Sequence, residues 1–185
     1  MKLTYRLLEH PFYQAWNEGK VSMEQLSKYA ASYAEFIGRM PVYWKRISDA
    51  FDTDNPDLLK IENEEQEHIA LWESWTSKMD RSNEYPKMDK IFEAFDNMSP
   101  SELLGAVHAF EVQQPEVAET KKRGLIGHYG FSASDLSYFD EHMQEEAHIK
   151  LGIAMADKHA DHEQFKSGFE TGSRLIYEGL DLFVN

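Results

Sequence analysis

Two short motifs in the chain pair a glutamate with a histidine three residues later, and they are Glu65–His68 and Glu145–His148. On an α-helix, residues i and i+3 lie about 60° apart on one face, so each pair can hold a metal ion. Between the motifs, Glu111 stands in an apolar segment, where a carboxylate is costly to bury unless it is paired or bound to metal. Carboxylate and imidazole ligands without sulfur suit iron or manganese more than copper.

Other residues near these motifs extend the pattern. Glu35 lies upstream in a similarly apolar setting, which makes the order along the chain Glu, E-x-x-H, Glu, E-x-x-H. This is the ligand order of carboxylate-bridged di-iron and di-manganese helix bundles. His142 lies three residues before Glu145, and Glu141 lies four residues before it, so we expect one of these two to supply a further ligand. The sequence therefore predicts a site for two divalent metal ions.

A solvated, charged surface is the alternative origin of these motifs. An acidic chain with 8 histidines can contain E-x-x-H by chance, and Glu35 alone fits a surface residue equally well. Two such pairs on separate helices, with Glu111 between them, favour the metal site. The other histidines are interpreted as capping, packing or surface residues: His10, His108, His128, His159 and His162.

Helices are the elements that would position these side chains. Capping boxes at Ser22 and Ser99, and a cap at Asn55 before Pro56, precede apolar residues that recur at intervals of three and four. Pro41 and Pro115 should bend or break their helices. We expect one all-α domain over residues 1–185, with a loop at 77–87 and helices at 2–9, 11–18, 22–50, 56–78, 88–97, 100–125, 133–158 and 161–183.

Composition narrows the class of protein. The chain has 185 residues, with 33 acidic and 19 basic side chains and a net charge of −14, which argues against nucleic acid or an anionic membrane as a partner. The absence of cysteine excludes disulfides, iron–sulfur clusters, thiolate zinc sites and a cysteine nucleophile. No run of apolar residues is long enough to span a bilayer and the N-terminus lacks an apolar signal core, so we expect a cytoplasmic protein.

Four sequence blocks resemble a known family. The segment HPFYQAWNEGKVSMEQLSKYAASYAEFIGRMP resembles the N-terminal signature of the haem-oxygenase-like fold in its thiaminase-II and pyrroloquinoline-quinone-synthase branch. The blocks EEQEHIALW, AFEVQQPEVAETKKRGLIGHYGF and LSYFDEHMQEEAHIKL resemble the subgroup of the chlamydial protein associating with death domains. This subgroup belongs to the haem-oxygenase-like di-metal oxidases. The resemblance implies a seven-helix bundle without haem, in which two metal ions, usually iron, activate dioxygen.

The resemblance also implies roles for particular residues. The ligands map to Glu64 or Glu65 with His68, to Glu111, and to a last group: His142, Glu145 or Glu146, and His148. The chlamydial protein is described as a self-sacrificing 4-aminobenzoate synthase, and its ring-donating tyrosine matches Tyr13, its amine-donating lysine matches Lys121, and a second tyrosine matches Tyr29. On one continuous helix, Lys121 would lie near the face of Glu111. Both metal motifs are shorter than in the subgroup, which makes Glu35 a candidate replacement ligand.

These observations predict a metal-dependent oxidoreductase that activates dioxygen. It would consume either its own Tyr13 or a small amino-acid-like or fatty-acid-like substrate. A non-catalytic interaction protein that keeps the fold is the alternative, because an acidic surface suits a protein partner. The apolar C-terminal helix and the habit of the family indicate a homodimer.

Overall fold

Helices form all the regular secondary structure in residues 1–52, 54–80 and 82–184, the part of the chain that the computed structural model describes. The all-α expectation is therefore confirmed. The α-helices are α1 (Pro11–Asn17), α2 (Met23–Phe51), α3 (Pro56–Thr76), α4 (Asp89–Asp96), α5 (Pro100–Glu111), α6 (Gln114–His128), α7 (Ser137–His142), α8 (Glu146–His159) and α9 (His162–Gly179). Three 3-10 turns accompany them: η1 (Leu7–Glu9), η2 (Ala133–Asp135) and η3 (Leu180–Phe183).

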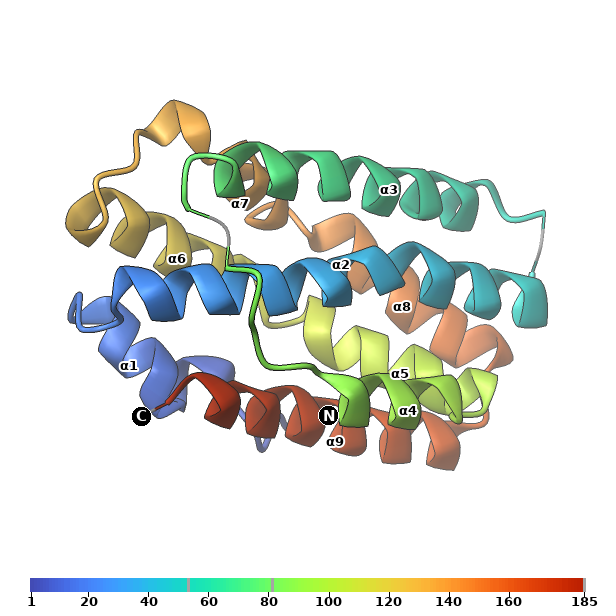
Figure 1. The fold of residues 1–185 in the computed structure, drawn as a ribbon. Helices are drawn as coiled ribbons and strands as arrows, with labels where there is room; N and C mark the ends of the chain where they lie inside the picture. Colours follow the sequence, from blue (N-terminus) through green and yellow to red (C-terminus); the bar gives the residue numbers. More distant parts are fainter. Residues whose placement is uncertain (53, 81, 185) are drawn as a thin grey trace.

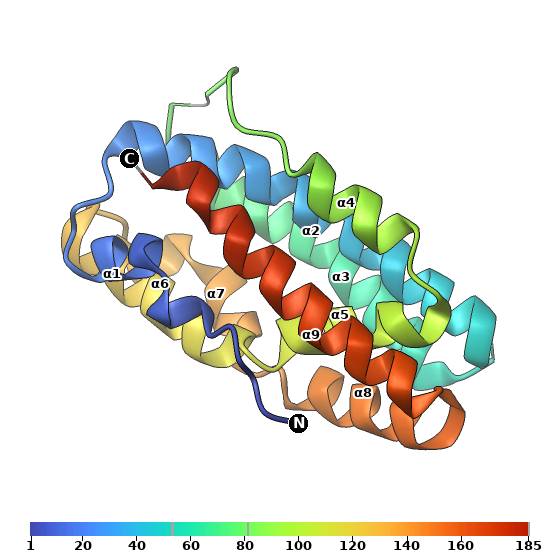
Figure 2. The ribbon, with the colours of Figure 1, turned by 90° about the horizontal axis from the view of Figure 1, so that it is seen from below.

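The long helices α2 and α3 pack along each other on one side of the bundle (Figure 1). Helix α5 lies in the middle, in contact with α2, α8 and α9, and α9 runs diagonally over it when the bundle is seen from below (Figure 2). Because α3, α5 and α8 approach one another in the interior, a residue from each can reach a common point.

Glycines allow α5 and α9 to touch backbone to backbone. A Cβ atom on Gly168 would lie 1.9 Å from the carbonyl oxygen of Glu102, and one on Gly105 would lie 2.0 Å from that of Phe165. No side chain fits into such a contact, and a packed interior does not yield to make room for one. The position of α5, which carries Glu111 at its last residue, is fixed by this contact.

The predicted helix starts are largely confirmed. Ser22 and Ser99 form complete capping boxes, and Asn55 caps α3. The helix predicted at 2–9 is wrong, because only the turn η1 forms there. His10 is extended (φ −70°, ψ 140°), as a residue before proline usually is, and its side chain caps α1 by accepting a hydrogen bond from the Phe12 N–H. The chain therefore cannot run helically from residue 9 into α1.

Two of the long predicted helices are broken. The helix expected at 100–125 divides into α5 and α6, with Pro115 in the first turn of α6, whereas Pro41 lies inside an uninterrupted α2. The helix expected at 133–158 is wrong, because it consists of η2, α7 and α8, with a turn at 143–145. If α5–α6 and α7–α8 are each counted once, seven helices remain, the number that the resemblance implies.

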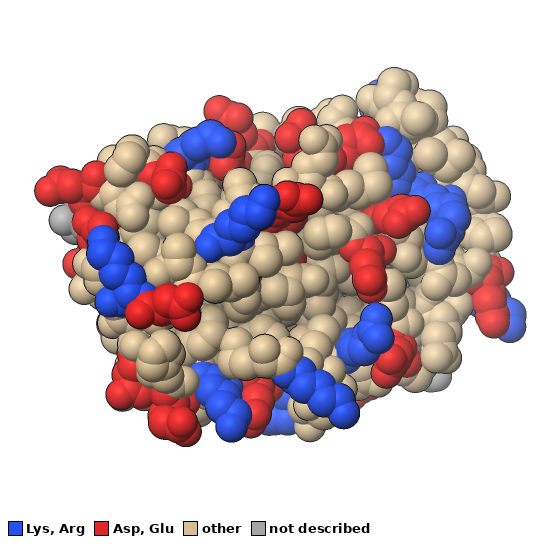
Figure 3. All heavy atoms as spheres, turned by 180° about the vertical axis from the view of Figure 1, so that it is seen from behind, with Lys and Arg blue, Asp and Glu red and all other residues tan. Residues whose placement is uncertain are grey.

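Most charged side chains lie on the surface, and large aromatic side chains lie in the core. Acidic and basic side chains are interspersed over the face drawn in Figure 3. Trp72 and Trp75 are buried in the core. Among the described residues, no helix combines the length and apolarity needed to cross a bilayer. Residues 77–87 include the expected loop, and its Arg81 lies outside the described part of the chain.

Candidate metal centre

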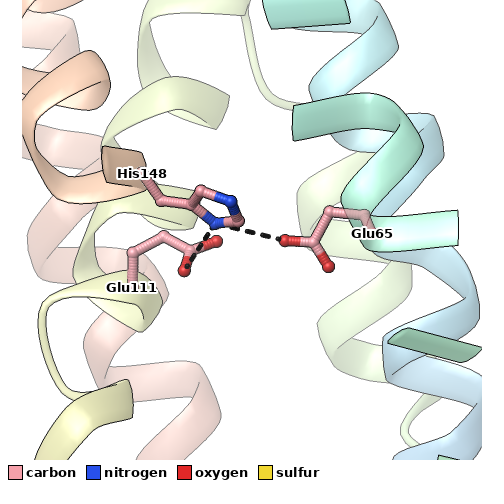
Figure 4. A group of neighbouring side chains, drawn as sticks. All are labelled: Glu65, Glu111 and His148. Carbon is pink, nitrogen blue, oxygen red and sulfur yellow. Dashed lines mark ion pairs between the residues drawn. The ribbon is translucent and has the colours of Figure 1, made fainter. Parts of the chain in front are cut away.

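Three buried side chains from three helices meet at one point in the interior. Glu65 comes from α3, Glu111 from the end of α5, and His148 from α8, and one potential ligand atom from each lies within 4.8 Å of the others. Figure 4 shows both carboxylates directed at the imidazole ring. His148 Nδ1 lies 3.7 Å from Glu65 Oε1 and 3.7 Å from Glu111 Oε2. Their exposed fractions are 3%, 1% and 5%, so water does not screen them.

Three further buried side chains surround this group. Glu145 Oε2 lies 2.8 Å from His148 Nδ1, and its other oxygen lies 3.7 Å from His142 Nε2. His68 Nδ1 lies 3.4 Å from Glu65 Oε2, and the rings of His68 and His142 are 4.3 Å apart. Six predicted residues thus lie together, and we refer to them as the hexad: Glu65, His68, Glu111, His142, Glu145 and His148.

The turn between α7 and α8 explains how the last three residues of the hexad converge. On one straight helix, His142, Glu145 and His148 would spread over about 120° of the surface. In the structure α7 ends at His142, and Glu145 precedes the first residue of α8. All three side chains are consequently buried, while the neighbouring alternatives Glu141 and Glu146 are exposed.

Polar atoms in the hexad fit a bound cation. Glu111 Oε1 and His148 Nδ1 are buried without a hydrogen-bond partner, because the nearby Glu145 oxygen does not lie along the N–H direction of the ring. An unpartnered buried polar group costs about 1–3 kcal/mol, which a metal ion would offset. Three carboxylates with three imidazoles are a donor set suited to iron or manganese.

The pKa shifts in the hexad indicate that its buried carboxylates lack sufficient compensating positive charge. Burial, the largest influence, raises the pKa of both Glu65 and Glu111, and in Glu111 the neighbouring Glu145 adds to the rise. Burial acts to lower the pKa of His148, but Glu111 and Glu145 raise it to about 12. Without metal, the protonated imidazole of His148 therefore compensates the carboxylates.

Glu35 lies outside the hexad. Its carboxylate accepts a hydrogen bond from the Tyr85 hydroxyl (2.8 Å) and is paired with Lys87. The inward positions of this part of α2 belong to its neighbours Tyr33 and Phe36, so Glu35 is half exposed. The structure therefore places Glu35 as a surface residue and does not bring it to the ligand position expected of it.

The three residues that the resemblance assigned to aminobenzoate formation also lie together. The hydroxyl groups of Tyr13 and Tyr29 are 3.3 Å apart in the core. The Lys121 amine lies 5.3 Å from the centre of the Tyr29 ring and 5.8 Å from that of Tyr13. Lys121 is only 1% exposed, and burial lowers its pKa to about 7. A substantial fraction of this amine is therefore neutral and nucleophilic near neutral pH.

The helical argument that placed Lys121 near Glu111 fails, because the chain breaks between α5 and α6. The amine is buried instead among aromatic rings of α1, α2 and α3, and α1 also contacts the main chain of Lys121. The Trp16 indole N–H donates to the Lys121 carbonyl oxygen (3.3 Å), and Gly124 on the next turn of α6 leaves room for the indole.

Aromatic side chains fill the space between Lys121 and the hexad. The ring of Tyr33 lies 4.9 Å from that of Trp72, which lies 4.8 Å from that of Tyr138, and Tyr138 lies 4.0 Å from His142. Tyr138 was not identified from the sequence. Its spacing of four residues from His142, which places both on one helix face, is the signal that would have found it.

A small cavity adjoins the tyrosines. It has a volume of about 20 Å³ and is lined by Tyr13, Tyr29, Tyr33 and mainly apolar neighbours. A cavity of this volume holds about one water-sized molecule.

Comparisons with known proteins complete the description of the site. No protein-family model matches the chain. It is 34% identical over 164 residues to a protein of Chlamydia muridarum named 4-aminobenzoate synthase, covering 78% of this chain and 68% of that relative. A protein of the same name from Nitrosomonas europaea is 27% identical over 209 residues, covering 97% and 84%. A solved TenA homologue from Pseudomonas syringae pv. tomato has a TM-score of 0.71 at 15% identity, covering 97% and 86%, which confirms the predicted fold.

Proposed function

Because the chain belongs to the family of the chlamydial 4-aminobenzoate synthases, we propose that it makes 4-aminobenzoate from its own side chains beside a centre of two divalent metal ions. The observation that carries this proposal is the fully buried Lys121 amine among the rings of Tyr13, Tyr29 and Tyr33. A lysine is rarely buried without a carboxylate partner, because desolvating its charge is costly. A role as a neutral amine donor explains its position.

The bonds that change follow from comparing tyrosine with 4-aminobenzoate. The product would keep the six ring carbons and Cβ of Tyr13, so the Cα–Cβ bond breaks and Cβ is oxidised to the carboxylate, with dioxygen as the oxidant. Cα would stay in the main chain and take up a hydrogen atom. The phenol oxygen would leave as water when the Lys121 nitrogen replaces it, and oxidation by dioxygen would break the bond from that nitrogen to Cε, which would remain in the protein as an aldehyde. Proximity of the two side chains lowers the entropic part of the barrier.

The residues of the hexad would bind the metal ions through their carboxylate oxygens and imidazole nitrogens. When bound, iron or manganese would supply the reduction of dioxygen. The surrounding core excludes bulk water from both the hexad and Lys121, which strengthens electrostatic interactions there. The aromatic side chains between the two sites hold Lys121 apart from the carboxylates that would otherwise favour its protonated form.

The size of the cavity at the tyrosines favours the protein's own ring over an external substrate. A volume of about 20 Å³ does not admit an amino acid or a fatty acid without rearrangement of the core. This observation supports consumption of Tyr13 within the broader class of dioxygen-dependent oxidation.

An isotope experiment tests the proposed function. Protein containing ring-labelled tyrosine would be loaded with iron or manganese, reduced and exposed to dioxygen, and then product and protein would be analysed by mass spectrometry. We expect labelled 4-aminobenzoate and matching losses of mass at Tyr13 and Lys121. Product formed with Tyr13 intact would exclude self-sacrifice, and absence of both metal binding and product would favour the non-catalytic interaction protein.

A further inference from the structure

Two histidines of the hexad are each held by a hydrogen bond on the side of the ring that faces away from the carboxylates of the hexad. His142 Nδ1 donates to the carbonyl oxygen of Tyr138 (2.7 Å), which turns its Nε2 towards Glu145. His148 Nε2 donates to Glu64 Oε2 (3.3 Å), which leaves its Nδ1 facing inwards. The first contact is to the main chain, so no substitution of the acceptor residue removes it. The second is to a side chain, which can be changed.

Glu64 occupies the outer side of His148. It neighbours Glu65 on α3, but the two side chains lie in different surroundings: Glu65 is buried, and Glu64 is half exposed. The second oxygen of Glu64 pairs with Lys60 Nζ at 3.1 Å, one turn earlier on the same helix. Glu64 is therefore held from the solvent side by Lys60 and reaches His148 from there.

No other hydrogen bond orients the His148 ring. Its Nδ1 has no hydrogen-bond partner among the described residues, although three carboxylates lie within 3.7 Å. Without the Nε2 contact, only the ion pairs at Nδ1 would restrain the orientation of the ring. Outer carboxylates that accept from a ligating imidazole commonly fix its orientation in metal sites.

We propose that Glu64 is a positioning residue that holds His148 Nδ1 towards Glu65, Glu111 and Glu145, and that Glu64 is not itself a metal ligand. This inference rests on the metal centre of the proposed function. It also resolves the choice between Glu64 and Glu65 that the sequence left open: Glu65 ligates, and Glu64 orients.

Manganese binding separates these roles. Mn(II) would be titrated into metal-free wild type, Glu64→Ala, Glu64→Gln and the control Glu67→Ala, whose exposed side chain lies on the same helix. Free Mn(II) would be followed by electron paramagnetic resonance. We expect Glu64→Ala to weaken binding about 10- to 100-fold without changing the stoichiometry. Glu64→Gln, whose amide oxygen can still accept, should stay within a few-fold of wild type, as should the control.

Two results of the titration would overturn the proposal. An unchanged dissociation constant in Glu64→Ala would show that the contact does not matter for the site. Loss of one equivalent of Mn(II) in both Glu64 variants would identify Glu64 as a ligand.

A measurement on the metal-free protein makes the inference independent of metal loading. In nitrogen-15-labelled wild type and Glu64→Gln, the His148 Nε2–H proton should give a downfield resonance that exchanges slowly with water. The signal should disappear in Glu64→Ala, and its persistence there would refute the positioning role. If wild type binds no Mn(II), the proposed function fails, while this resonance still decides whether Glu64 orients His148.

Discussion

The Lys121 amine lies 4.1 Å from the centre of the Tyr33 ring, closer than to the ring of Tyr29 or Tyr13. The Tyr33 ring in turn stacks on that of Tyr29, and its hydroxyl accepts a hydrogen bond from Gln114 (3.2 Å). Tyr33 therefore forms the surface on which the amine rests. Among the described residues no carboxylate forms an ion pair with Lys121, and burial lowers the pKa of its amine.

Removing the Lys121 amine should change how stability depends on pH. Because the folded pKa of about 7 lies below the unfolded value of 10.5, the unfolded chain binds more protons between these values, and stability rises with pH there. Relative to Lys121→Met, wild type should gain about 2 kcal/mol from pH 7 to pH 9. Urea unfolding of the metal-free proteins measures this difference, and parallel curves would contradict it.

His108 should make the protein sensitive to acid. Burial lowers the pKa of this core histidine from 6.5 to about 4, so the folded state keeps it neutral. Its contribution to stability is complete above pH 6.5 and is lost as pH falls towards 4. His108→Gln should retain about 2 kcal/mol more of its stability than wild type over this range. His162→Gln, at an exposed position, is the control and should follow wild type in the same unfolding titration.

Divalent metal should stabilise the fold through the hexad. A ligand at 100 times its dissociation constant adds about 2.7 kcal/mol to the free energy of unfolding, so Mn(II) should raise the melting temperature of wild type. His68→Ala and Glu111→Ala should lose most of this effect, because each removes a donor atom. Glu35→Ala should keep it, since that carboxylate is paired with Lys87. Calorimetry with and without Mn(II) measures the effect, and a loss in Glu35→Ala would return that residue to the ligand set.

The contact between α5 and α9 should tolerate no added methyl group. Gly168→Ala places Cβ 1.9 Å from a main-chain oxygen, so the helices must separate, at a cost of about 3 kcal/mol. Gly38→Ala in α2 meets nothing within 4 Å and should stabilise the protein by about 0.5–1 kcal/mol. Urea unfolding compares the two, and equal effects would show that the close contact is not maintained in solution.

The helix starts at Ser22, Asn55 and Ser99 and most residues of the hexad could be predicted from local sequence, because capping and E-x-x-H spacing act within one or two turns. The break between α5 and α6 was indicated by Pro115, but the break between α7 and α8 could not be predicted. No proline or glycine at residues 143–145 indicates a break there. The break depends instead on how Glu145 and His142 pack against α3 and α5. Glu35 was wrongly expected at the metal site. Its neighbours in the sequence are apolar, but these do not show which side of the helix Glu35 itself lies on. Its partner Lys87 comes from a loop that is distant in the sequence, so local sequence could not reveal the pairing.

The turn before α8 places two carboxylates of the hexad at helix ends of opposite polarity. Glu145 stands at the amino end of α8 and Glu111 at the carboxyl end of α5, where the macrodipoles of the two helices present charges of opposite sign. Negative charge is favoured at the first position and disfavoured at the second. A cation held between the two carboxylates would be favoured by the dipole of α5 and opposed by that of α8, so the carboxylate at the start of α8 would compensate that helix end.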